Sequence, residues 1–222
     1  MPQRVPFRNR AHEVSRLEAF SDVVFGFALT LIVVSLEVPK TYQELMSAMR
    51  DFPAFALCFA ILIWIWHAHY TYFRRYGLHD EFTIWMNTFL LFLVLFYVYP
   101  LKFVFASFGG HRGYEVHEAR VLFTIYGLGF AGIFIIYALL YGHALKKRDA
   151  LQLNAVEQHD TATHVMMFGG HVAVGLTSII LALFLPDRLV GLAGYVYFVI
   201  GLVSWYVGAS RGEKRRAVEE AM

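Results

Sequence analysis

The chain has 222 residues, of which 58% are hydrophobic and only 16% are charged, and its mean hydropathy is +0.52. A soluble domain of this length would carry more charge and a smaller apolar fraction, so the composition excludes that class and indicates a polytopic membrane protein. The net charge of +2 gives no reason to expect a nucleic-acid partner, and the single cysteine, Cys58, excludes a disulfide scaffold or a thiolate metal site within one chain.

The first predicted element is a membrane-spanning helix over residues 16–38. Basic residues precede it, as they would in a signal peptide. However, the apolar run is too long, contains Asp22, and is followed by no small-residue cleavage pattern. We therefore interpret this segment as a retained transmembrane helix.

Five further segments are each long enough to cross about 30 Å of hydrocarbon, which takes roughly 20 helical residues. With the first, the predicted spans are residues 16–38, 52–73, 82–108, 119–145, 164–185 and 189–209. Only three residues, beginning at Pro186, separate the last two spans, which predicts a tight helical hairpin. The polar residues 154–160 are predicted to lie in a loop, and residues 211–222 to extend the last helix along the membrane surface. The predicted fold class is all-α, with residues 1–222 forming one six-helix transmembrane domain.

The distribution of basic residues predicts the orientation of these spans. Thirteen of the nineteen Lys and Arg residues fall in the two termini and the second and fourth loops, and six fall on the other side. The positive-inside rule therefore places both termini in the cytoplasm.

The side chains of the first span separate into faces when they are placed on a helix with 3.6 residues per turn. One face consists of Phe20, Val23, Phe27, Thr30, Leu31 and Val34. Small residues such as Gly26 and Ala28 lie on its flanks, where they allow close helix packing. Periodicity alone favours ordinary core or lipid-facing surface for this face, because membrane helices are apolar all round.

Asp22 is the ionisable residue that needs an explanation in this span. It points away from the face containing Phe27, toward the other helices of the chain. A carboxylate inside an apolar segment is costly unless it is paired or hydrogen-bonded, so it marks a candidate functional site. Asp22 either handles ions itself or braces the helix.

Three stretches of the sequence together resemble a known family. The run Arg16-Leu17-Glu18-Ala19-Phe20-Ser21-Asp22 resembles the first-helix signature of the endosomal/lysosomal potassium channel family (transmembrane protein 175 family). Trp66 and His69 look like the end of that family's second helix, and Trp85 and Asn87 look like its third. The likeness extends from Arg16 to about residue 100 and is closest to the prokaryotic single-repeat members.

The resemblance implies a potassium-selective channel in a prokaryotic plasma membrane. Such channels are homotetramers of six-helix subunits, in which the first helices of four subunits line one pore. In that family, the constriction is made by side chains that begin five residues after the motif Asp. Carried onto this chain, the constriction positions are Phe27, Thr30, Leu31 and Val34. The family usually has a branched aliphatic residue where this chain has Phe27.

The chain has no T-V-G-Y-G filter loop, so selectivity would come from side chains. An apolar ring can gate by dewetting, while Thr30 hydroxyls could replace part of the hydration shell of an ion. Such a filter predicts modest discrimination between potassium and sodium.

The resemblance also implies a hydrogen-bonded network around the motif. Its expected members are Arg16, Phe20, Ser21, Asp22, His69, Trp85 and Asn87. The expected role of this network is to hold the pore helix in register and to help assemble the tetramer, without touching the ion.

Two other classes of function stay open as alternatives. A secondary transporter could use Asp22 as its coupling site, although transporters often have broken helices and these helices look continuous. An intramembrane enzyme is not expected, because the spans contain no paired carboxylates, Ser/His pair or metal-spaced ligand set. We therefore expect no cofactor and no bound metal, and the expected partners are permeant potassium, the lipid bilayer and further copies of the chain.

Overall fold

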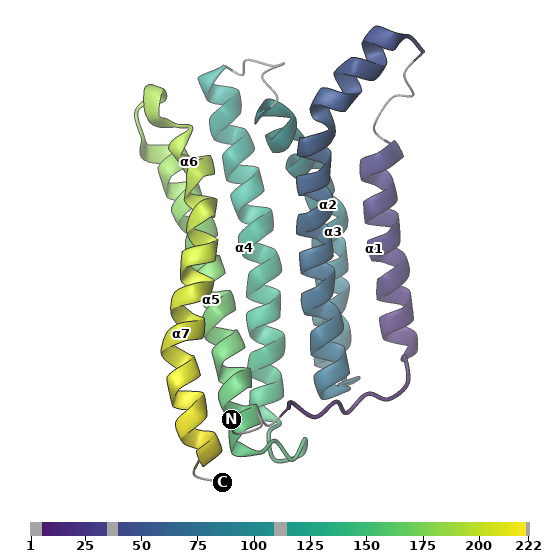
Figure 1. Ribbon diagram of the computed structural model, residues 1–222, viewed down its shortest axis with the longest axis vertical. Helices are drawn as coiled ribbons and strands as arrows, with labels where there is room; N and C mark the ends of the chain where they lie inside the picture. Colours follow the sequence, from purple (N-terminus) through teal and green to yellow (C-terminus); the bar gives the residue numbers. More distant parts are fainter. Residues whose placement is uncertain (1–5, 35–39, 109–114, 221–222) are drawn as a thin grey trace.

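The computed structural model describes residues 6–34, 40–108 and 115–220, and this part of the chain is a bundle of helices (Figure 1). The long helices are α1 (Arg16–Val34), α2 (Tyr42–Tyr76), α3 (Glu81–Phe108), α4 (Val116–Lys146), α5 (Ala155–Phe184) and α7 (Val199–Glu220). Three short pieces precede α7: η1 (Asp187–Leu189), α6 (Leu192–Tyr195) and η2 (Val196–Phe198). Among these described residues, six segments are long and apolar enough to cross a membrane, the last running from Asp187 to Glu220. The predicted all-α fold with six spans is therefore confirmed.

Two predicted segments differ from the structure. Residues 154–160 are not a loop, because α5 begins at Ala155, nine residues before the predicted start of the fifth span. The sixth span is not one continuous helix over residues 189–209, because two 3₁₀ turns interrupt the chain before α7 begins at Val199. The predicted helical extension after residue 210 does form, since α7 reaches Glu220. Residues 35–38 of the predicted first span lie outside the described residues.

Local signals in the sequence set several helix ends. Ser15 and Glu18 form a capping box at the start of α1: the Ser15 amide donates to Glu18 Oε2 at 3.0 Å, and the Glu18 amide donates to Ser15 Oγ at 3.2 Å. Thr41 caps α2 in a similar way by accepting from the Glu44 amide. At the other end of α2, Gly77 adopts the left-handed conformation (φ 57°) that glycine accommodates without strain.

The helices pack side by side, with α1 at one edge of the bundle and α7 at the opposite edge (Figure 1). The main contacts of α1 are with α2 and α3, and α4 packs most extensively against α5. Two glycines make the α4–α5 approach close. A Cβ on Gly127 would lie 2.6 Å from Ile179 Cγ1, and a Cβ on Gly175 would lie 3.2 Å from the Ala131 Cβ. Small residues at such crossings are the usual means of close packing in membranes.

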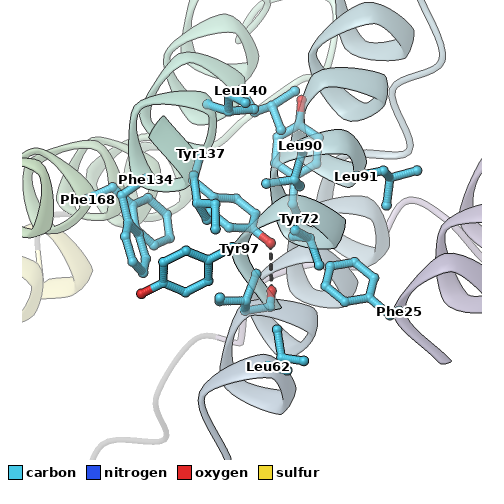
Figure 2. Packing of buried hydrophobic residues seen from close by; sticks show 14 of the residues in the cluster. Phe25, Leu62, Tyr72, Leu90, Leu91, Tyr97, Phe134, Tyr137, Leu140 and Phe168 are labelled. Carbon is cyan, nitrogen blue, oxygen red and sulfur yellow. Dashed lines mark hydrogen bonds between the residues drawn. The ribbon is translucent and has the colours of Figure 1, made fainter. Parts of the chain in front are cut away.

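The core between α2, α3, α4 and α5 is rich in aromatic side chains (Figure 2). Tyr137 of α4 crosses to α2 and donates its hydroxyl to the Ile65 carbonyl at 2.6 Å. Tyr72 on α2 packs against Tyr141 on α4, with ring centroids 5.3 Å apart. These contacts fix α2 against the rest of the bundle, and α2 in turn supports α1.

Candidate functional site

The α1 helix has two chemically different faces. Its buried face consists of Glu18, Ser21, Phe25, Ala28 and Ile32, which recur every three or four residues as a single helical stripe requires. This stripe packs on α2 and α3. Among the described residues, the opposite face of α1 is therefore left without a packing partner.

The predicted pore-facing residues all lie on this exposed face. Phe27 is 63% exposed and Val34 is 74% exposed, although both are large apolar side chains. Thr30 and Leu31 lie on the same face and are also exposed. In the membrane-spanning part of a protein, such a face contacts lipid, another subunit or a pore.

Thr30 is the polar residue on this face between Phe27 and Val34. Its hydroxyl donates to the Gly26 carbonyl one turn earlier, at 2.5 Å. The hydroxyl proton is therefore used within the helix, and the oxygen keeps lone pairs that can face outward. Thr30 can thus offer an oxygen ligand without leaving its own donor unsatisfied.

Behind the exposed face, a buried chain of hydrogen bonds joins three helices. Asn87 Nδ2 on α3 donates to Ser21 Oγ on α1 at 2.9 Å, and Ser21 donates in turn to the Leu17 carbonyl at 2.7 Å. Asn87 Oδ1 lies 2.9 Å from His69 Nε2 on α2, and because an amide oxygen only accepts, His69 is the donor. Ser21, His69 and Asn87 are all buried.

Asp22 has a partner that the sequence did not identify as a network member. The indole nitrogen of Trp66 donates to Asp22 Oδ1 at 2.8 Å, and the Trp66 ring stacks on Tyr70 with centroids 5.7 Å apart. In the sequence, Trp66 indicates only the likeness to the family. The sequence spacing contains a signal for this contact. Trp66 and His69 are three residues apart and so share a face of one helix, and Asp22 directly follows Ser21 on the other helix.

Three residues of the predicted network lie apart from it. Trp85 is 61% exposed on α3, and Arg16 and Phe20 are exposed on α1. Within the described part of the chain, the structure assigns no hydrogen bond to the side chains of Arg16 or Trp85. Within one chain, the Ser21–Asn87–His69 hydrogen bonds therefore form without Arg16, Phe20 or Trp85, and Asp22 is bound by Trp66.

A second polar cluster joins the start of α3 to the end of α4. Asp80 accepts from the Thr83 amide at 3.1 Å, from His143 Nε2 at 2.6 Å and from Lys147 Nζ at 2.5 Å. Burial opposes ionisation here, but the hydrogen bonds from Lys147, Thr83 and His143 outweigh it and hold the pKa of Asp80 well below its usual range. The carboxylate therefore stays ionised and holds the two helix ends together.

The arrangement of residues around α1 is suited to positioning this helix and to permeation along its exposed face. Among the described residues, no three His, Cys, Asp or Glu side chains are grouped closely enough to hold a metal ion. The polar groups near α1 are hydrogen-bonded to one another behind an exposed, mainly apolar face. That arrangement fits a helix held rigidly from one side.

Comparisons with known proteins point to one family. Residues 16–97 match the model of the endosomal/lysosomal potassium channel TMEM175. A potassium channel from Marivirga tractuosa is 38% identical, over 95% of this chain and 92% of the relative. A potassium channel from Chamaesiphon minutus is 30% identical, over 71% of this chain and 79% of the relative.

Two solved structures have a similar architecture. A crystal structure of a variant of the potassium channel MtTMEM175, in complex with a nanobody fusion protein, superposes with a TM-score of 0.81 at 34% sequence identity. The alignment covers 96% of this chain and all of the other. The crystal structure of a lysosomal potassium-selective channel homologue from Chamaesiphon minutus has a TM-score of 0.63 at 24% identity, over 90% of this chain and 99% of the other, and supports the fold.

Proposed function

This chain belongs to the endosomal/lysosomal potassium channel family, and from that premise we propose that it is a homotetrameric potassium channel whose pore is lined by α1. Its family consists of ion channels and not enzymes. The observation that carries the proposal is the exposed face of α1 that contains Phe27, Thr30, Leu31 and Val34. In a symmetric tetramer, four copies of this face surround one axis.

The lining of this pore is mainly apolar. Phe27 and Val34 form rings that can exclude water and so gate the pore, while Thr30 oxygens between them replace part of the hydration shell of a passing ion. Their lone pairs are free for this role because the hydroxyl proton is held by the Gly26 carbonyl. Side-chain rings of this kind give modest selectivity for potassium over sodium.

The hydrogen bonds behind the pore face have a supporting role. Ser21 is tied to Asn87, and Asp22 is tied to Trp66, so α1 is held to both α2 and α3 on the side away from the pore. This use of Asp22 argues against the alternative of a secondary transporter that couples through its carboxylate. The potassium channel relatives argue against it independently.

The proposed location is a prokaryotic plasma membrane, with both termini in the cytoplasm. Most basic residues lie at one end of the bundle, as the positive-inside rule requires for a cytoplasmic end. The start of α5 and the end of α7 lie together at that end, where Arg215 Nε binds the Asp160 carboxylate at 2.9 Å. The residue 6–15 segment lies at the same end (Figure 1).

Potassium flux through proteoliposomes tests the proposal. The wild type should carry a downhill, uncoupled potassium flux. Phe27→Ala should raise the conductance several-fold because it widens the apolar ring, and Thr30→Ala should change the ratio of potassium to sodium flux. Phe92→Ala is the matched control, because Phe92 is similarly exposed (65%) but lies on α3. Flux that is coupled stoichiometrically to protons or sodium, or that is changed equally by Phe92→Ala, would contradict the proposal.

A further inference from the structure

The segment before α1, residues 6–15, crosses one end of the bundle and reaches the start of α5 (Figure 1). We call this segment the N-terminal strap. It is tied to the C-terminal end of α2 by its backbone, because the amides of Arg10 and Ala11 both donate to the Arg74 carbonyl, at 3.1 and 3.3 Å. Phe7 of the strap packs edge-on against Tyr76, with ring centroids 5.6 Å apart.

The far end of the strap is held by a single buried carboxylate, Glu157. Its side chain is only 1% exposed. Glu157 accepts from the Arg8 backbone amide at 3.0 Å, from Arg8 Nη2 at 2.9 Å and from Arg10 Nη2 at 2.7 Å. Arg10 also donates to the Leu151 carbonyl at 2.8 Å, so the strap is attached to the α4–α5 connection as well.

Glu157 has a second role that can be separated from this one. It occupies the third position of α5, where its carboxylate accepts from the Asn154 amide at 3.1 Å and completes a capping box. Glutamine serves in a capping box as glutamate does, but it cannot form ion pairs with arginine. A Glu157→Gln substitution therefore removes the charge that holds the strap while leaving the helix start intact.

The strap matters because it attaches α1 to a different part of the bundle from the one that α1 packs against. The main contacts of α1 are with α2 and α3, whereas Glu157 belongs to α5. The strap runs directly into α1, whose first residue is Arg16. It therefore links the N-terminal end of the proposed pore helix to α5, on the far side of the bundle.

We infer that Glu157 is a positioning residue for the pore: by clamping Arg8 and Arg10, it draws the N-terminal end of α1 toward its own subunit and away from the pore axis. This inference rests on the proposed function of α1. Four apolar faces meeting at one axis gain by burying one another, which closes a pore. The clamp opposes that movement at one end of each helix.

Single-channel recording of the full-length tetramer in planar bilayers tests this inference. Glu157→Gln should lower the open probability at least about tenfold, while single-channel conductance and ion selectivity stay unchanged because the pore-lining face is intact. Hydrogen exchange of the Arg10 and Ala11 amides should become faster in the same variant. The matched control is Glu118→Gln, because Glu118 accepts from the Glu115 amide at the start of α4, away from the strap.

Two more variants distinguish loss of the contact between Glu157 and the strap arginines from a general destabilisation of the protein. Arg10→Gln should also lower the open probability, but by less than Glu157→Gln because Arg8 still binds Glu157, and the double variant should lower it by less than the product of the two single fold-changes. Wild-type potassium current with an unchanged or higher open probability in Glu157→Gln would overturn the clamp alone. An absence of potassium current from the wild type would instead overturn the proposed function.

Discussion

At the scale of single residues, the buried chain Ser21–Asn87–His69 is the feature around α1 that depends most on every polar group being hydrogen-bonded. Polar groups in hydrocarbon are costly when unpaired, and an unsatisfied buried donor or acceptor costs about 1–3 kcal/mol. Here the Asn87 amide accepts from His69 and donates to Ser21, so one side chain satisfies a group on each of two other helices. Such a chain specifies the relative positions of three helices, which apolar contacts alone specify poorly.

The Asp22–Trp66 bond gives a residue-scale prediction with a built-in control. Trp66→Phe should lower the free energy of unfolding by about 1 kcal/mol, because it removes a hydrogen bond to a carboxylate at a partly exposed site. Trp85→Phe makes the same chemical change at an exposed position outside the network and should stay within about 0.5 kcal/mol of the wild type. Thermal unfolding of the detergent-solubilised channel measures both. Equal losses of unfolding free energy in the two variants would contradict a stabilising role for the Trp66–Asp22 hydrogen bond.

At the scale of elements, the Asp80 cluster predicts how stability depends on pH. The folded state holds the pKa of Asp80 below its ordinary value, so its contribution is fully present above about pH 4 and is lost as the pH falls through the lower, folded pKa. Asp80→Asn should therefore lower stability at neutral pH by about 1–2 kcal/mol, a range reduced for partial solvent exposure, and the difference from wild type should shrink in acid. Thermal midpoints measured from pH 7 downward would show this convergence.

Asp149→Asn is the control for Asp80→Asn. Asp149 is 94% exposed, and its nearest cationic atom, Arg148 Nε, is 3.8 Å away. Exposed pairs of this kind contribute little, so the variant should follow the wild type at every pH. A gap between Asp80→Asn and wild type that widens in acid would contradict the role assigned to Asp80.

Some features of the helices could be predicted from the sequence, and others could not. The six spans follow from apolar runs, and the exposed face of α1 follows from helical periodicity, both of which are local properties. The early start of α5 has a local signal, the capping box of Asn154 and Glu157. The attachment of this helix start to arginines about 150 residues earlier is not local, and no window of sequence reveals it. The pairing of Trp66 with Asp22 depends on helix packing in the same way.

At the scale of the whole molecule, the two faces of α1 indicate how the chain would assemble. The α1 helix is supported from behind by α2 and α3 and is held at its N-terminal end by the strap, yet its other face is mainly apolar and has no packing partner in the part of the chain that the structure describes. A monomer would leave that face to lipid. Four copies around an axis would turn it into a pore whose narrowest lining is made of Phe27, Thr30 and Val34 side chains.

The most direct test of this account is the accessibility of position 30 to a thiol-reactive cation in a conducting channel. The native Cys58 is buried, so the wild type should be insensitive to Ag⁺. Potassium current through Thr30→Cys should be blocked by Ag⁺. The block should develop faster when the channel is conducting. Thr177→Cys is the matched control, because Thr177 is also an exposed threonine bonded to its own helix, but on α5. Block in Thr30→Cys alone is the predicted result; an unblocked Thr30→Cys channel, or equal block in Thr177→Cys, would contradict a pore lined by α1.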